Sequence, residues 1–143
     1  MTDYANCAQQ RNLTDAGREE ARGIAAALRD LRIPVGPVLA SPYCRTMETG
    51  RLVFGSATAS NAVRGGPAST DNTQRYAGLV ALLSTPVAKG SNLAIASHGN
   101  PFRAITQSAY LSEGEAAVVA PGPGDGFTVI ARIPKDAWRT LDR

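Results

Sequence analysis

The residues best suited to chemistry in this sequence are one histidine and one arginine, each placed just after a short apolar run. His98, the only histidine among the 143 residues, follows the run in "NLAIASHGNP", and Arg45 follows a similar run in "PVLASPYCRT". An arginine offers a bidentate fork to phosphate oxygens, and an imidazole adds a donor that can titrate. Together these two side chains could bind an oxyanion if the fold brings them to one place.

Each residue also has a plain structural interpretation. A lone histidine after a strand is often a hydrogen-bonded structural residue, and an arginine at the start of a helix is often solvated. The residues alone leave both interpretations of His98 and Arg45 open.

The elements that must position these residues follow from the apolar spacing and from the helix-capping residues. Thr14 is a suitable N-cap for a helix that ends before Pro34, and the pair Asn100–Pro101 suits the start of a helix through about Tyr110. Further helices are predicted over 45–55 and 71–84, strands over 37–42 and 92–97, and two strands joined by a Gly/Pro loop within 116–133. Residues 56–70 are predicted to be a loop with at most a minor strand.

Alternation of strands and helices through the middle of the chain predicts an α/β fold with a mostly parallel sheet and helices on both faces. In such sheets, ligands gather at the carboxyl ends of the strands, beside the N-termini of helices. Both Arg45 and His98 are predicted to lie at such positions, where helix N-termini add backbone donors for an anion. The pattern therefore predicts an oxyanion pocket at one edge of the sheet.

Composition restricts the classes of partner. A length of 143 residues fits a single domain, 1–143, and the net charge of +3 is spread along the chain, which favours small anions and argues against nucleic acid. No apolar run approaches the ~20 residues of a membrane span, and the N-terminus lacks the apolar segment of a signal peptide. Cys7 and Cys44, the two cysteines, are too few for a zinc site. They are either inert thiols or one disulfide.

Three motifs in order, "RNLTDAGREEA", "SPYCRTMET" and "ASHGNP", resemble those of the histidine phosphatase superfamily, which has the phosphoglycerate-mutase-like fold. The resemblance spans most of the chain and implies a three-layer α/β sandwich. It also implies hydrolysis of small phosphorylated substrates without a metal or cofactor, through a phosphohistidine intermediate. By motif, Arg45 matches the family's second arginine and His98 its second histidine, both of which stabilise charge on the phosphoryl group.

The sequence departs from the family in having no counterpart of the Arg-His-Gly or Arg-His-Ala motif whose histidine is the nucleophile. The opening residues "MTDY" resemble those just downstream of that motif, so we expect the domain to be incomplete at its N-terminus and to lack the first strand of the sheet. The chain as written is then expected to be inactive and, with unpaired strand edges, poorly stable. The alternative is a degenerate member that only binds phosphate-bearing ligands.

Nucleophilic attack by His98 itself is a further possibility, although it would leave Arg45 alone to hold the phosphoryl charge. Thr2 is a candidate phosphate contact, while Glu113 and Glu115, and more weakly Asp125, are candidates by residue type for the acid that protonates the leaving group.

The cysteines and the terminal tryptophan resemble a bacterial branch of the family whose members often carry export signals. This resemblance implies a Cys7–Cys44 disulfide and a periplasmic or secreted full-length parent. In a reducing cytoplasm the same pair would stay as thiols.

Overall fold

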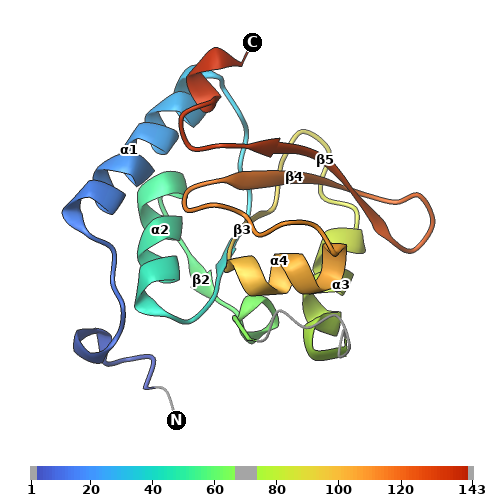
Figure 1. Ribbon diagram of the computed structural model, residues 1–143. Helices are drawn as coiled ribbons and strands as arrows, with labels where there is room; N and C mark the ends of the chain where they lie inside the picture. The colour runs from blue at the N-terminus through green and yellow to red at the C-terminus, as the bar shows by residue number, and fades with distance from the viewer. Residues whose placement is uncertain (1–2, 67–73, 142–143) are drawn as a thin grey trace.

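The structure is a computed structural model that describes residues 3–66 and 74–141 (Figure 1). Thr2, one of the candidate phosphate contacts, lies outside the described residues, as do residues 71–73 of the predicted helix 71–84. No helix among the described residues is long and apolar enough to cross a membrane.

Helix α1 (Asp15–Asp30) begins where the sequence predicts it to begin. The Thr14 hydroxyl accepts a hydrogen bond from the Gly17 N–H at 3.0 Å, which satisfies one of the donors exposed at a helix start. The helix ends at Asp30, a little before the predicted limit, and Arg32 then adopts a left-handed conformation with φ of 58°.

The parallel part of the sheet has three short strands. Strand β1 (Val38–Ala40) lies between β2 (Thr58–Ala59) and β3 (Ala94–Ala96), and all three run in the same direction. The register pairs Ala40 with Ala96, so β1 and β3 end side by side. The predicted mostly parallel arrangement is confirmed, and β2 is the minor strand expected within 56–70.

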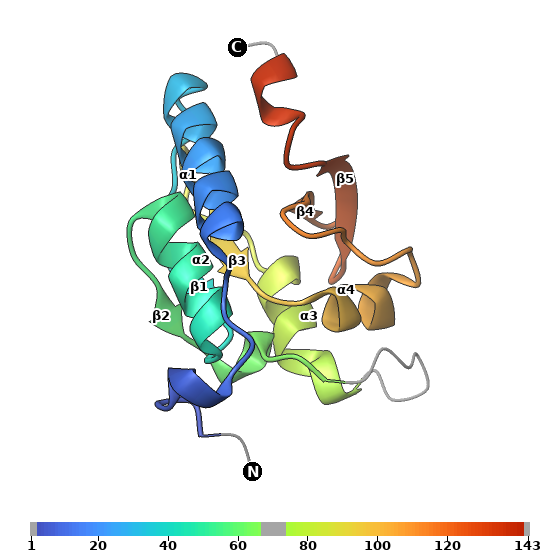
Figure 2. The same ribbon diagram turned by 60° about the vertical axis from the view of Figure 1, so that its left-hand side comes forward.

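Strands β4 (Ala116–Pro121) and β5 (Phe127–Ile133) form a separate antiparallel pair. Figure 2 shows the strands in the order β2, β1, β3, β4, β5, so that β3 and β4 are at the facing edges of the two sheets. On β3, Ala94 and Ala96 exchange backbone hydrogen bonds with the β1 segment. Because backbone groups alternate along a strand, the N–H and C=O of Ile95 point to the opposite edge, which no described strand pairs.

Helices cover both faces of the parallel sheet. In Figures 1 and 2, α1 and α2 (Cys44–Phe54) pack together on one side, and α3 (Ala77–Ser84) and α4 (Gly99–Thr106) lie on the other. The 3-10 turns include η1 (Cys7–Gln9), η2 (Asn61–Val63) and η4 (Trp138–Thr140). The predicted α/β class with a parallel sheet between helices is therefore confirmed.

The core is divided in the same way as the helices. One cluster joins α1 to β5 and η4 through Ala27, Leu28, Ile133 and Trp138. The other joins η2, α3 and α4 through Val63, Tyr76, Leu79 and Ala104. Val53 and Phe54 of α2 pack against the first cluster, so each cluster anchors one pair of helices, α1 with α2 and α3 with α4. The parallel sheet is thus packed on both faces.

Two predicted boundaries of α4 are wrong. His98, and not Asn100, is the residue before the first helical turn, so Asn100 and Pro101 lie inside the helix. The helix also ends at Thr106, before Tyr110, because Gln107 takes a left-handed conformation with φ of 58°. The Asn100 side chain instead donates a hydrogen bond to the Gly66 carbonyl at 2.7 Å.

Candidate functional site

Two strand-to-helix turns place Arg45 and His98 at the same edge of the sheet. Strand β1 leads through Ser41 to α2, where Arg45 is the second helical residue. Strand β3 leads through Ser97 to His98, which directly precedes α4. Because β1 and β3 are adjacent and parallel, their carboxyl ends bring both turns together.

The side chains of Arg45 and His98 meet. Arg45 Nη2 lies 3.4 Å from His98 Nδ1, and His98 Nε2 lies 2.7 Å from the buried Ser41 Oγ. A guanidinium can only donate, so Nδ1 is the acceptor, and the neutral ring then carries its proton on Nε2 and donates it to Ser41. Two residues that are distant in sequence are thus brought into one site, as the strand ends predict.

Aromatic rings pack around this pair. The Tyr43 ring lies edge-on to the His98 ring with centroids 5.4 Å apart, and the Arg45 guanidinium lies 4.6 Å from the Tyr43 centroid. Tyr4 packs edge-on against Tyr43 at 5.1 Å. Arg45 makes no ion pair with any carboxylate in residues 3–66 or 74–141. Its positive charge is therefore available to an anion.

The environment keeps His98 neutral at physiological pH. Burial is the main cause and the nearby charge of Arg45 adds to it, so that the pKa of His98 falls from 6.5 to about 4. An anion bound beside the ring would oppose both effects and raise the pKa of His98, because an opposite charge within ~4–6 Å favours the charged form.

The lowered pKa of His98 has a consequence for stability. Between pH 6.5 and 4 the unfolded chain binds a proton at His98 that the folded protein resists, so stability is lost as the pH falls through this range. Because the ring is only half-buried, solvent screening reduces the effect, and we expect a loss of about 1 to 2 kcal/mol.

Urea unfolding of the parent and of a His98→Gln variant at several pH values measures this loss. The variant carries no titrating ring, so its free energy of unfolding should fall less between pH 6.5 and 4. Equal slopes for the two proteins would show that His98 titrates alike in the folded and unfolded chains.

Several neighbours of the pair were not predicted from the sequence. Ser41 accepts a hydrogen bond from His98, Tyr43 packs on both members of the pair, and Gly65 lies against the His98 ring. Tyr43 could have been predicted to lie near the site, because it stands between the end of β1 and Arg45 in the sequence. Gly65 comes from a loop, and its approach to His98 depends on tertiary structure, so no local pattern marks it.

Gly65 leaves no room for a side chain beside His98. A Cβ atom added there would lie 2.9 Å from His98 Cδ2 and 3.1 Å from Cγ, so the ring would have to move. We expect Gly65→Ala to lower the free energy of unfolding by ~1–3 kcal/mol, as overpacking commonly does.

Gly23→Ala is a matched control, because nothing lies within 4 Å of that position on α1. It should raise stability by about 0.4–1 kcal/mol, since alanine favours helix and loses less entropy on folding. The midpoint of urea unfolding reports both changes. A Gly65→Ala midpoint at or above that of the parent would show that a methyl group at this position does not clash with the His98 ring.

The candidate acids are not brought into contact with Arg45 or His98. Both Arg132 Nε and Nη2 lie 2.9 Å from the Glu115 carboxylate, and the Ser112 N–H donates to it at 2.8 Å. These hydrogen bonds lower the pKa of Glu115 to about 2, and those from Arg132 contribute most. Glu115 is therefore ionised and held in an ion pair with Arg132, and its role as the leaving-group acid stays a prediction that this pairing does not support.

The other two carboxylates are exposed. Glu113 lies in the turn before β4, and its charge adds to that of Glu20, the main cause, in raising the pKa of Lys135. Asp125 lies in the loop between β4 and β5. A role for either as the leaving-group acid stays a prediction.

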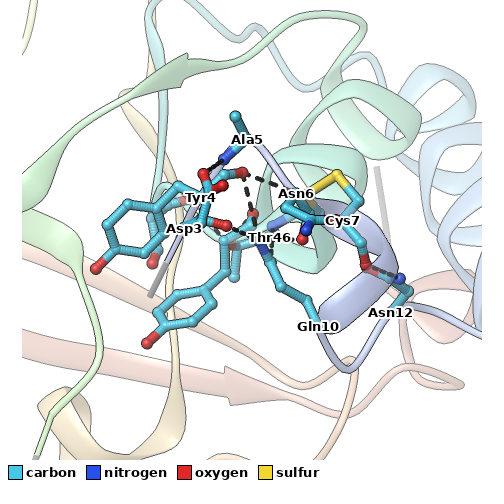
Figure 3. Close-up of a disulfide and its surroundings, with 11 residues drawn as sticks. Asp3, Tyr4, Ala5, Asn6, Cys7, Gln10, Asn12 and Thr46 are labelled. Atoms are coloured by element: carbon cyan, nitrogen blue, oxygen red, sulfur yellow. Dashed lines mark hydrogen bonds between the residues drawn. A yellow bond between two sulfur atoms is a disulfide. The ribbon is translucent and has the colours of Figure 1, made fainter. Parts of the chain in front are cut away.

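Cys7 and Cys44 form a disulfide, shown in Figure 3, which settles the two alternatives that the sequence leaves open. It joins η1 to the first residue of α2, next to Arg45. Gln10 reinforces the connection, since its Oε1 accepts a hydrogen bond from the Cys44 N–H at 2.8 Å and its Nε2 donates to backbone carbonyls of the N-terminal segment, that of Tyr4 at 3.3 Å among them. The segment 3–10 is thereby fixed against the start of α2.

Among the described residues, no group of three or more His, Cys, Asp or Glu side chains is arranged to hold a metal ion. The groups that the site offers for chemistry are the Arg45 guanidinium fork, the titratable His98 ring and the backbone N–H groups at the start of α2 and α4.

Two solved structures are similar to this chain. The protein histidine phosphatase SixA, in complex with tungstate, has a TM-score of 0.59 at 22% identity, covering 87% of this chain and 85% of that one. The proposed phosphohistidine phosphatase SixA from Agrobacterium tumefaciens has a TM-score of 0.56 at 17% identity, covering 93% and 86%. No protein-family model and no curated protein matches the sequence. The chain thus shares the fold of these two SixA structures, an α/β fold of the class that its sequence predicts.

Proposed function

We propose that the Arg45–His98 pair binds the phosphoryl group of a small phosphorylated substrate, in a domain that hydrolyses phosphate monoesters. The observation that carries the proposal is the 3.4 Å approach of Arg45 Nη2 to His98 Nδ1 across two strand ends, with no carboxylate of the described residues neutralising the guanidinium. The fold of SixA supports it, and the tungstate bound to one of the similar structures is an analogue of phosphate.

In this proposal the two side chains have different tasks. Arg45 holds two phosphoryl oxygens with its guanidinium fork. His98 is neutral in the free protein. The doubly charged phosphoryl group of the bound substrate raises the pKa of His98, so that the ring takes up a proton and donates a hydrogen bond to a third phosphoryl oxygen. Both groups stabilise the negative charge that spreads over the phosphoryl oxygens during transfer.

The nucleophile of a phosphohistidine route is a second histidine, which residues 1–143 do not contain. We propose that it lies in the complete protein on a strand paired with the free edge of β3. The separation of the two sheets and the outward-facing backbone groups of Ile95 support this place. A histidine at the end of a strand parallel to β3 would reach the edge at which His98 lies, and the domain 1–143 would then lack one strand.

In this proposal the reaction has two steps, transfer of the phosphoryl group to the histidine and then to water. The nucleophilic nitrogen attacks phosphorus, a P–N bond forms, the P–O bond to the leaving group breaks, and the departing oxygen takes a proton from an acid. Water then attacks phosphorus and gives a proton to the conjugate base of that acid, the P–N bond breaks, and phosphate leaves while the histidine and the acid are restored. Covalent capture thus divides one difficult hydrolysis into two displacements.

Calorimetric titration with tungstate and turnover of p-nitrophenyl phosphate test the proposal on two forms of the protein. The 143-residue chain should bind tungstate without turnover. A longer form with its upstream-encoded residues should turn over and carry an acid-labile phosphohistidine. Labelling lost only in a variant of the upstream histidine would support the assignment, whereas labelling of the 143-residue chain that is lost in His98→Ala would make His98 the nucleophile.

Two outcomes would overturn parts of the proposal. Failure of the 143-residue chain to bind tungstate at Arg45 would end it altogether. Tungstate binding by the longer form without turnover would replace hydrolysis with the second candidate, a domain that only binds phosphate-bearing ligands. Both similar structures are described as phosphatases, so they lend no support to that second candidate.

A further inference from the structure

Tyr43 holds a central place beside the proposed phosphate site, although its residue type assigns it no chemistry. The centroid of its ring lies 4.6 Å from the Arg45 guanidinium and 5.4 Å from the centroid of the His98 ring, in a T-shaped arrangement. No other described side chain has a recorded ring contact with both members of the pair. Any movement of the Tyr43 ring would therefore disturb both groups that bind the anion.

The backbone of Tyr43 is fixed in place. Its carbonyl accepts hydrogen bonds from the Met47 N–H at 3.0 Å and from Thr46 Oγ1 at 2.9 Å. The preceding Pro42 further restricts the turn between β1 and α2. With the backbone anchored, the ring direction depends on what packs against it.

Tyr4 supplies that packing on the outer side. Its ring meets the Tyr43 ring at an interplanar angle of 88°, the edge-to-face arrangement that aromatic pairs favour. Tyr4 belongs to the segment fixed by the Cys7–Cys44 disulfide and by the Gln10 hydrogen bonds (Figure 3). The covalent link therefore holds Tyr4 against Tyr43, and Tyr43 against Arg45.

An aromatic ring suits this position better than a carboxylate would. Other arginines of the described residues, such as Arg18 and Arg132, are held by glutamates, which neutralise their charge. A ring face orients a guanidinium through its π electrons and leaves the positive charge and the outer N–H groups to a ligand. An arginine that must receive an anion gains orientation in this way without losing charge.

We propose that Tyr43 is a positioning residue that aims Arg45 and His98 at the bound anion, and that the disulfide-held Tyr4 keeps it in place. This inference rests on the proposed phosphate site. The inference assigns the positioning task to the ring of Tyr43 and none to its hydroxyl. A variant that keeps the ring and one that removes it should therefore differ.

Tungstate titrations of Tyr43→Leu, Tyr43→Phe and Tyr4→Leu test the inference. Tyr43→Leu should weaken binding roughly three- to tenfold, Tyr43→Phe should bind like the parent because the ring is kept, and Tyr4→Leu should show a smaller loss. The His98 ring resonances in NMR spectra should move in Tyr43→Leu even without tungstate. Urea unfolding identifies a variant that has merely lost stability.

The possible failures are distinguishable. A parent that does not bind tungstate would refute the phosphate site itself. A parent that binds, together with a folded Tyr43→Leu variant of equal affinity, would overturn the positioning task and leave the phosphate site standing. A loss in Tyr43→Phe as large as that in Tyr43→Leu would assign the task to the hydroxyl instead.

Discussion

Substitution of Arg45 by alanine is expected to weaken tungstate binding roughly 10- to 100-fold. Hydrogen bonds to charged groups contribute ~1.5–3 kcal/mol, and each 1.4 kcal/mol is about a tenfold change in affinity. Arg45 has no ion pair to release within the described residues, so its removal takes away attraction for the anion without freeing a buried carboxylate.

Arg51→Ala is the matched control for this change. Arg51 is an exposed arginine in the last turn of the same helix, so its loss alters net charge equally while leaving the site intact. Its tungstate affinity should stay within about twofold of the parent at moderate ionic strength, where exposed charges are screened. Arg45→Lys should lie between the two, because an ammonium keeps the charge but loses the planar fork. Equal losses in Arg45→Ala and Arg51→Ala would show that tungstate responds only to overall charge.

Loss of the disulfide is expected to lower the free energy of unfolding by about 3 to 4 kcal/mol. Cys7 and Cys44 are separated by 37 positions, and closing a loop of that length restricts the unfolded chain by this amount in the chain-entropy description. The loss is a large part of the ~5–15 kcal/mol typical of a small domain. Unpaired strand edges at β3 and β4 add to the expectation of low stability.

Cys7→Ser is the variant of choice, because Cys7 is exposed and belongs to η1, whereas Cys44 is part of α2 and adjoins Arg45. Urea unfolding with and without reductant should give the variant one midpoint and the parent two, with the reduced parent close to the variant. A parent whose midpoint is unchanged by full reduction would contradict the expected contribution.

The convergence of Arg45 and His98 was predictable because it depends on local pattern and on one general property of parallel sheets. Apolar runs mark the ends of β1 and β3, and adjacent parallel strands end at the same edge. The fold class follows from the same alternation of elements, and the order of the motifs pointed to the fold that the SixA structures share.

What could not be predicted depends on contacts between distant segments. The ion pair of Glu115 with Arg132, on the neighbouring strand, is one such contact, because nothing near Glu115 in sequence indicates that partner. Tyr4 packs on Tyr43 from a segment that the disulfide ties to α2, and the spacing of two cysteines leaves that disulfide open. The Asn100 side chain, which the sequence favours as the N-cap of α4, instead donates to the distant Gly66 carbonyl, and the helix begins after His98.

Titration of the His98 ring by NMR, with and without tungstate, tests the central claim most directly. Without the anion, the pKa of His98 should lie near its lowered value of about 4. Saturating tungstate should raise the pKa by ~1–3 units and shift the ring resonances, and Arg45→Ala should abolish both effects. A His98 titration that tungstate leaves unchanged, while the anion binds elsewhere on the protein, would contradict the account.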